Sequence, residues 1–225
     1  MPADPNDLDL LTDLLARAKT AGADAADAVM VHATSLSHAR RLGELERLER
    51  AESSDLGLRV LVGRQQAVVS STDVTPGTLA QLAEQAVAMA RSVPEDPNCG
   101  LADPEQIARE VPELDVCDPE EPATEVLIER AKACEDAARA VPGITNSEGA
   151  EAGWSMSRVT LAATNGFTGG YAGSSHSIGV AVLAGEGQGM ERDYDFSSVV
   201  YGSDLEDPAE VGFDRQRARR RKAGQ

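Results

Sequence analysis

The chain has 225 residues, of which 41% are hydrophobic, and a formal net charge of −17 at pH 7. This length and composition allow one large or two small domains with hydrophobic cores. The negative charge repels a phosphate backbone and disfavours nucleic acid as a partner. No stretch approaches the roughly 20 consecutive apolar residues that a membrane-spanning helix needs, and no basic segment followed by an apolar run opens the chain. We therefore expect a cytoplasmic protein that makes no contact with a membrane.

The chain begins with a helix followed by strands. Apolar residues at helical spacing predict a helix that is capped by Asp7 or Asp9 and ends near Gly22. Several short strands are expected after it. Among these, residues 56–62 alternate at period two and turn into residues 66–71, which predicts a β-hairpin.

A second helix and a linker complete the first half. Proline directly after Thr75 marks the start of the helix, and Pro94 marks its end. Residues 94–122 contain six prolines and many acidic residues, a composition that is typical of a linker. We therefore place a first α/β module at residues 1–93 and a domain boundary in the linker.

The layout of helix and strands recurs in residues 123–212, which form the second predicted module. An amphipathic helix begins at Thr124, and the short alternating segments after it predict an antiparallel meander. Asn165 and Gly166 predict a hairpin turn because both residues tolerate positive φ. The meander is also dense in glycine, which indicates bulges, close approach of backbones or contact with another chain.

Together these patterns predict an α+β chain of two sequential modules, each with helices packed on an antiparallel β-sheet. Residues 213–225 do not fit either module, since they supply six of the 21 basic residues and no acid after Asp214. Such a run could bind nucleic acid or an acidic surface. We favour the simpler interpretation of a disordered or non-native tail.

Candidate contact residues lie in the second module. Trp154, Tyr171, Tyr194 and Phe196 are four of the chain's seven aromatic residues. Core packing is the simpler interpretation of these side chains, and contact with a peptide or another subunit is the alternative. The candidates for such a contact are Trp154, Asn165, Gly166, Tyr171, Tyr194 and Phe196.

The residues do not predict a catalytic or metal site. A zinc hydrolase helix needs two histidines one turn apart, and His32, His38 and His176 lack that spacing. We expect structural histidines that are hydrogen-bonded or exposed. Ser174 and Ser175 precede His176, but neighbours on a strand point to opposite faces and no nucleophile-elbow pattern surrounds them.

Three stretches carry a family resemblance: "GLRVLVGRQQAVVSSTDVTPGTLAQLAEQAVAMAR", "PEDPNCGLADPE" and "NSEGAEAGWSMSRVTLAATNGFTGGYAGSSHSIGVAVLAGEGQGMERDYDFSSVVYGSDLEDPAEVG". They occur in order and cover most of residues 7–212. They resemble the N-terminal half of the TldD/PmbA family, also called modulator of DNA gyrase, and are most similar to its PmbA/TldE branch.

The resemblance implies a cytoplasmic two-subunit metalloprotease that cleaves unfolded or small peptide substrates. In this family a TldD-like subunit holds zinc through a His-Glu-x-x-x-His helix, and the PmbA-like subunit lacks that helix. The motif is absent from this sequence. The resemblance therefore implies a non-catalytic accessory subunit with no cofactor of its own, which associates with a zinc-bearing TldD-like subunit or with itself. An unfolded substrate could add as a strand to an exposed sheet edge.

The sequence also departs from the family. Members continue into a C-terminal β-rich domain, whereas here "DPAEVG" is followed by "FDRQRARRRKAGQ". A truncated gene product or a frameshift would explain this ending and would leave bare the surfaces that the missing domain covers. Two other hypotheses stay open: a non-enzymatic interaction module that modulates gyrase or a toxin–antitoxin system, and a non-functional remnant.

Overall fold

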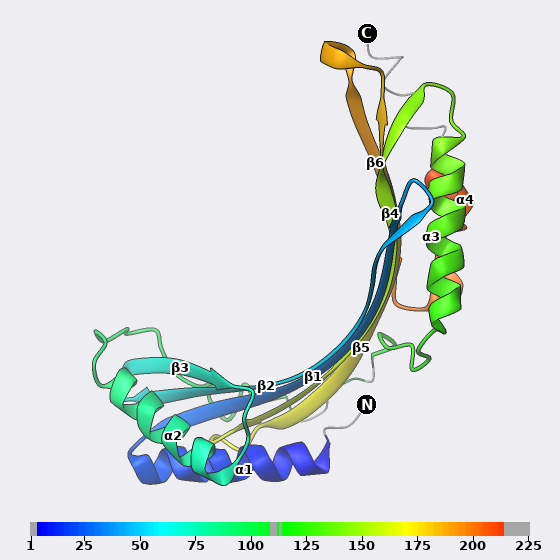
Figure 1. Cartoon of the computed structure of the whole chain (residues 1–225). Helices are drawn as coiled ribbons and strands as arrows, with labels where there is room; N and C mark the ends of the chain where they lie inside the picture. Colours follow the sequence, from blue (N-terminus) through cyan, green and yellow to red (C-terminus); the bar gives the residue numbers. More distant parts are fainter. Residues whose placement is uncertain (1–3, 109–111, 113, 214–225) are drawn as a thin grey trace. The chain divides into compact units, whose positions relative to one another are not determined.

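The computed structural model describes residues 4–108, 112 and 114–213, and within them the strands form a six-stranded sheet in the order β3-β2-β1-β4-β5-β6. The elements are α1 (Pro5–Ala21), β1 (Ala25–Arg41), β2 (Glu44–Val62), β3 (Gln65–Ser71), α2 (Pro76–Ala90), α3 (Thr124–Arg139), β4 (Ile144–Ala163), β5 (Thr168–Ala184), η1 (Gly187–Gly189), β6 (Glu191–Val199), η2 (Gly202–Asp204) and α4 (Pro208–Gly212) (Figure 1). The α+β class with an antiparallel sheet is confirmed. The predicted basic tail lies almost wholly outside the described residues.

Two compact units divide the chain, and their segments interleave. Unit 1 comprises Met1–Ala33, Glu52–Asp115 and Ser157–Ala172. Unit 2 comprises Thr34–Ala51, Val116–Met156 and Gly173–Gln225. The sequence predicted modules at residues 1–93 and 123–212 from the recurring layout and the proline-rich linker, and it predicted short strands within them. The observed strands β1, β2, β4 and β5 have 17 to 20 residues, and each contributes to both units.

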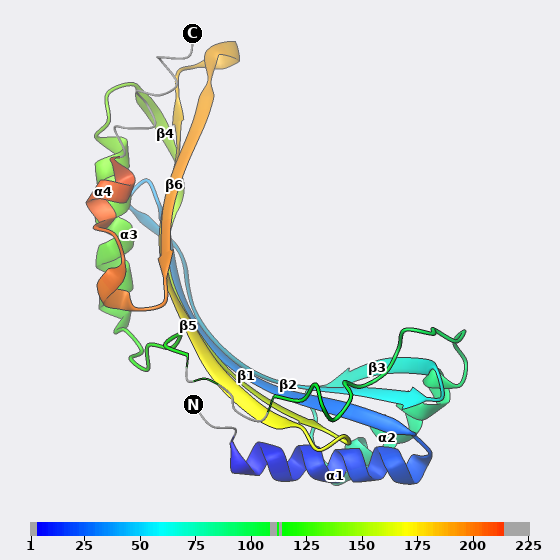
Figure 2. The ribbon, with the colours of Figure 1, turned by 180° about the vertical axis from the view of Figure 1, so that it is seen from behind.

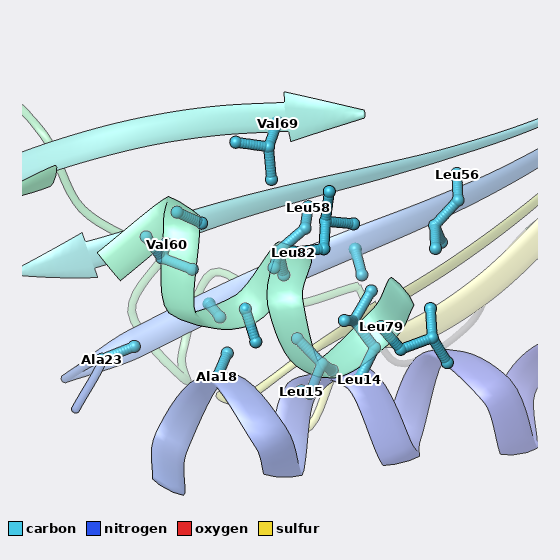
Figure 3. Close-up of a cluster of buried hydrophobic side chains, with 14 of the residues drawn as sticks. Leu14, Leu15, Ala18, Ala23, Leu56, Leu58, Val60, Val69, Leu79 and Leu82 are labelled. Atoms are coloured by element: carbon cyan, nitrogen blue, oxygen red, sulfur yellow. The ribbon is translucent and has the colours of Figure 1, made fainter. Parts of the chain in front are cut away.

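In unit 1, α1 and α2 cover one face of the strands. The alternating residues Leu56, Leu58 and Val60 of β2 all point to the helices because side chains on a strand alternate between faces (Figure 3). The core that they form with the helices contains Leu14, Leu15, Ala18, Leu79 and Leu82. The predicted hairpin is confirmed, with Leu58 opposite Val69 across β2 and β3.

Helix α1 begins one turn earlier than the sequence predicted. Asp4, not Asp7 or Asp9, is the N-cap, and its carboxylate accepts a hydrogen bond from the Asn6 N–H at 2.9 Å. The helix ends as predicted at Gly22, whose φ of 106° is accessible to glycine. The change of cap leaves Asp7 inside the helix, where it is buried.

In unit 2, α3 and α4 pack together and α3 covers one face of the strands (Figure 2). The core residues on α3 and the strands are Leu127, Ala131, Cys134, Ala138, Ala150, Ala152, Trp154, Ile178, Val180 and Val182. Burying a single Leu or Ile side chain contributes about 1.5–3 kcal/mol, so this layer is the main source of stability of unit 2. No helix within the described ranges is long and apolar enough to span a bilayer.

Candidate functional site: a groove on the second unit

A groove of about 760 Å³ lies on unit 2 and is bordered by residues of β1, β2, β4, β5 and β6. Its floor on β5 is made of Ser177, Gly179 and Ala181. These small residues alternate with Ile178 and Val180, which are buried in the core with α3. Because successive side chains on a strand point to opposite faces, the floor of the groove is the sheet face that α3 does not cover.

Two aromatic residues of β6 form one wall of the groove. Tyr194 is 53% exposed and Phe196 is 62% exposed. Phe196 lies directly opposite Gly179 in the antiparallel pairing of β5 and β6. A Cβ atom on Gly179 would lie 3.3 Å from the Phe196 Cβ, which is tighter than ordinary contact. The absence of a side chain at Gly179 therefore provides room for Phe196 on the neighbouring strand.

The charged residues of the groove are mostly acidic. They are Glu46, Glu148, Glu151, Asp195, Arg40 and Arg192. Arg192 Nε donates to Glu148 Oε2 at 2.6 Å, and its guanidinium carbon lies 5.3 Å from the centre of the Tyr194 ring. Arg47 Nη2 donates to Glu151 Oε1 at 2.6 Å. Arg192 and Arg47 thus each pair with a carboxylate that borders the groove.

The outer edge of β6 is occupied by its own side chains. The Tyr194 N–H donates to Asp193 Oδ1 at 3.0 Å, and the Phe196 N–H donates to Asp195 Oδ1 at 2.9 Å. Residues two apart on an antiparallel edge strand present their N–H groups to the same side. An added strand would have to displace these carboxylates, so β6 is a poor template for strand addition.

Of the six predicted contact residues, the structure brings Tyr194 and Phe196 together in the groove. Trp154 is only 3% exposed and packs in the core of unit 2, where its indole Nε1 has no hydrogen-bond partner among the described atoms.

The other three lie in unit 1. Asn165 and Gly166 form the predicted turn between β4 and β5, where Asn165 Oδ1 accepts from the Phe167 N–H at 3.2 Å and Gly166 has a φ of 92°. The Asn165 side-chain amide also donates to the Ala102 carbonyl at 3.0 Å. Tyr171 is 51% exposed and does not border the groove.

Sequence reasoning missed a buried acid that supports one border of the groove. Glu135 of α3 is 0% exposed, and its carboxylate accepts from Arg40 Nε at 3.2 Å, the Leu42 N–H at 2.6 Å, the Gly43 N–H at 3.1 Å and Ser147 Oγ at 2.8 Å. Leu42 and Gly43 both have positive φ in the turn between β1 and β2. The carboxylate therefore ties this turn, and the groove residue Arg40, to α3.

Burial by itself would raise the pKa of Glu135. The hydrogen bonds from Ser147, Gly43 and Leu42, together with the charge of Arg40, outweigh it and lower the pKa below its ordinary value. Glu135 is hence a carboxylate at neutral pH. The signal in the sequence was its position, because Glu135 stands one residue after Cys134 on the apolar stripe of the helix.

The histidines have different surroundings. His32 is hydrogen-bonded as predicted, with Nδ1 2.8 Å from Ser54 Oγ and Nε2 3.0 Å from Asp7 Oδ1. His38 and His176 are buried, and burial lowers the pKa of each below the ordinary value. Their Nδ1 atoms have no hydrogen-bond partner among the described atoms.

His176 also approaches a carboxylate, since its Nε2 lies 3.1 Å from Asp118 Oδ2. Asp118 accepts from the N–H groups of Gly202 and Glu120, both at 3.0 Å, and these bonds lower its pKa. Asp118 therefore joins the segment before α3 to η2. Within residues 4–108, 112 and 114–213, no three His, Cys, Asp or Glu side chains are grouped so that they could hold a metal ion.

Comparison with known proteins identifies the family. Residues 26–90 match the PmbA/TldA metallopeptidase domain 1, and residues 117–223 match the PmbA/TldA metallopeptidase central domain. Metalloprotease PmbA of Escherichia coli O157:H7 is 34% identical over 192 residues, which are 85% of this chain and 43% of that protein. The PmbA homolog of Haemophilus influenzae is 29% identical over 196 residues, which are 87% of this chain and 43% of that protein.

Solved structures show the same fold. A proposed modulator of DNA gyrase from Bacteroides thetaiotaomicron has a TM-score of 0.86 at 22% identity, covering 97% of this chain and 49% of that one. TldE from Thermococcus kodakarensis has a TM-score of 0.74 at 16% identity, covering 90% and 45%. The chain spans less than half the length of these relatives. It belongs to the PmbA/TldD family of metallopeptidases.

Proposed function

We propose that this chain serves as a non-catalytic, PmbA/TldE-like part of a cytoplasmic metallopeptidase and that its groove receives unfolded or small peptide substrates. Membership of the family supports the peptidase context. The 34% identity to a protein named metalloprotease PmbA supports the PmbA branch. The sequence contains no His-Glu-x-x-x-His motif, so we assign the catalytic zinc to a TldD-like partner.

The observation that carries the proposal is the shape and chemistry of the groove. Small side chains on β5 leave an open floor, and Tyr194 and Phe196 stand beside it with more than half of their surface exposed. Exposed aromatic side chains next to a concave surface are typical of contact sites for peptides and proteins. A floor without large side chains also leaves room for side chains of different sizes on a peptide.

The groove changes how a peptide is expected to bind. Strand addition at β6 would compete with the Asp193 and Asp195 carboxylates for the outward N–H groups of that strand. We therefore place the peptide on the open face of the sheet, against Phe196, and not along the edge of β6. Side-chain packing then contributes more to binding than backbone pairing.

The test is reconstitution with a zinc-bearing TldD-like subunit from the same organism. The two purified chains are mixed, their association is measured by size-exclusion chromatography, and cleavage of fluorescent casein is followed. We expect a complex that cleaves casein faster than the TldD-like subunit alone. The variant Phe196→Ala should reduce this gain without abolishing association.

The matched control is Tyr171→Ala, which removes another aromatic side chain that is more than half exposed, on β5 outside the groove. It should retain the full gain in cleavage. A complex that cleaves casein no faster than the TldD-like subunit alone would contradict the accessory role. Association without any gain would instead favour a non-enzymatic interaction module, and aggregation of the purified chain would favour a non-functional remnant.

A further inference from the structure

We infer that the groove selects extended polypeptide segments that carry arginine or lysine. This inference rests on the proposed peptide-binding role and adds to it the chemical class of the peptide. Three features of unit 2 carry it: the balance of charge around the groove, an arginine of the chain itself that occupies one end of it, and an aromatic ring that is exposed beside that end.

The charge balance of the groove favours a cation. Four acidic and two basic residues border it. The arginines are balanced by carboxylates, since Arg40 is bound to Glu135, Arg192 to Glu148 and Arg47 to Glu151. Glu46 adds a further exposed carboxylate at the β2 end of the groove. The chain as a whole carries −17. Glu46 and the negative charge of the whole chain therefore attract lysine and arginine side chains and repel aspartate and glutamate.

Arg192 shows how the groove holds a guanidinium. Its guanidinium lies over the ring of Tyr194 and donates to the Glu148 carboxylate. A cation held between an aromatic face and a carboxylate gains both the attraction of the ring and a charge-assisted hydrogen bond. The groove therefore already contains, between residues of β6 and β4, the kind of contact that an incoming arginine would make.

Phe196 offers the corresponding ring for a ligand. It follows Tyr194 by two residues, so both rings lie on the same face of β6. Phe196 is the more exposed of the two, at 62%, and among the described residues Tyr194 is the ring that has a cation above it. We assign the position over Phe196 to a lysine or arginine of the peptide.

The length of the segment follows from the sheet order. The groove is bordered from Glu46 on β2 to Phe196 on β6, which are four strand spacings apart. At about 4.8 Å per spacing this distance is about 19 Å, which about six extended residues would span. A hexapeptide is thus the smallest ligand that could contact both ends.

The test measures binding of labelled hexapeptides to the purified full chain by fluorescence anisotropy, without a partner and without proteolysis. Three alanine-based peptides carry two arginines, two glutamines or two glutamates at the same positions. We expect the arginine peptide to bind about tenfold more tightly than the glutamine peptide and to weaken when salt is raised. Equal affinity of the arginine and glutamine peptides would overturn the inference.

Variants separate binding in the groove from general attraction to an acidic protein. Phe196→Leu keeps an apolar side chain opposite Gly179 but removes the aromatic face, and it should weaken the arginine peptide about threefold. Glu46→Gln should weaken it by a similar factor. The matched controls are Tyr171→Ala and Glu84→Gln, both exposed in unit 1, and neither should change the affinity.

The outcomes distinguish the two proposals. Equal weakening by Glu84→Gln and Glu46→Gln would show that the attraction is general, and it would refute the selective groove. Preference for arginine that depends on Phe196, in a chain that gives no gain in casein cleavage, would keep the cationic groove and reject the accessory role. A gain in cleavage without preference for arginine would keep the accessory role and reject the cationic groove.

Discussion

The buried carboxylate of Glu135 makes a strong prediction about the stability of unit 2. Two variants remove it: Glu135→Ala deletes all four of its hydrogen bonds, and Glu135→Gln retains one acceptor oxygen but turns an NH2 group toward donors. In either variant the Arg40 side chain, which is 10% exposed, loses its charged partner. Two N–H groups of the turn between β1 and β2 lose an acceptor as well.

The size of the effect follows from these contacts. Removing one partner of a buried ion pair costs about 3–5 kcal/mol because the other charge stays buried. We therefore expect Glu135→Ala to lower the free energy of unfolding by about 4 kcal/mol. A hydrogen bond to a charged group contributes about 1.5–3 kcal/mol, so Glu135→Gln should cost about 2–3 kcal/mol. Both losses are large against the stability of a typical domain, which is about 5–15 kcal/mol.

Urea unfolding followed by fluorescence measures this loss. Trp154 is the chain's only tryptophan and is buried in the same core as α3, so its emission reports on unit 2. The control is Glu129→Gln, which removes an exposed carboxylate from the same helix and should change stability by less than about 0.5 kcal/mol. A similarly small change for Glu135→Gln would refute the reasoning.

Three further predictions follow from unit 2. A Cβ at Gly212 would collide with the Cys134 carbonyl oxygen, so Gly212→Ala should displace α4 from α3 and cost about 1–3 kcal/mol in urea unfolding; unchanged stability would contradict the tight packing. Burial raises the pKa of the Cys134 thiol to about 12, so mass spectrometry after iodoacetamide treatment at neutral pH should find the two partly exposed cysteines modified before it. Burial lowers the pKa of His38 and His176 below 6.5, so the folded state disfavours their charged forms. The two neutral histidines therefore contribute fully to the free energy of unfolding above pH 6.5, and this contribution is lost as the pH falls below that value. A free energy of unfolding that stays constant between about pH 7 and pH 5.5 would contradict this prediction.

Local chemistry made several elements predictable. Thr75 followed by proline marked the start of α2, and the structure has Thr75 as the N-cap of a helix from Pro76 to Ala90. Gly22 marked the end of α1, and the turn at Asn165 and Gly166 joins β4 to β5. In each case the signal was a residue whose own backbone preference fixes the conformation. Such signals do not depend on the rest of the fold.

The length of the strands was not predictable in the same way. The stretch 35–53 alternates weakly because residues 44–55 of β2 are exposed on both faces. Neither face of this part of β2 is buried, so no alternation of hydrophobic and polar residues is expected there. Strands of ordinary length have about five to six residues. This expectation favoured the prediction of many short strands. The interleaving of the two units follows from strands that are much longer than that.

The candidate site was predictable only in part, because the face of a strand residue depends on register. Gly149 of β4 has a φ of 111° and shifts the alternation, so that Ser147, Ala150 and Ala152 are all buried. Trp154 follows on the same face and is buried with them. A sequence shows that an aromatic residue lies on a strand, but an inserted residue decides whether that side chain faces the core or the groove.

The glycine density of β5 has a physical meaning once the two faces are separated. Ile178 and Val180 pack in the core with α3, while Ser177, Gly179 and Ala181 form the floor of the groove. A strand with large residues on both faces would be stable only with a second covering layer. A strand with large residues on one face and small ones on the other keeps its core and leaves the second face accessible. The same alternation therefore stabilises unit 2 and provides the surface to which we assign peptide binding.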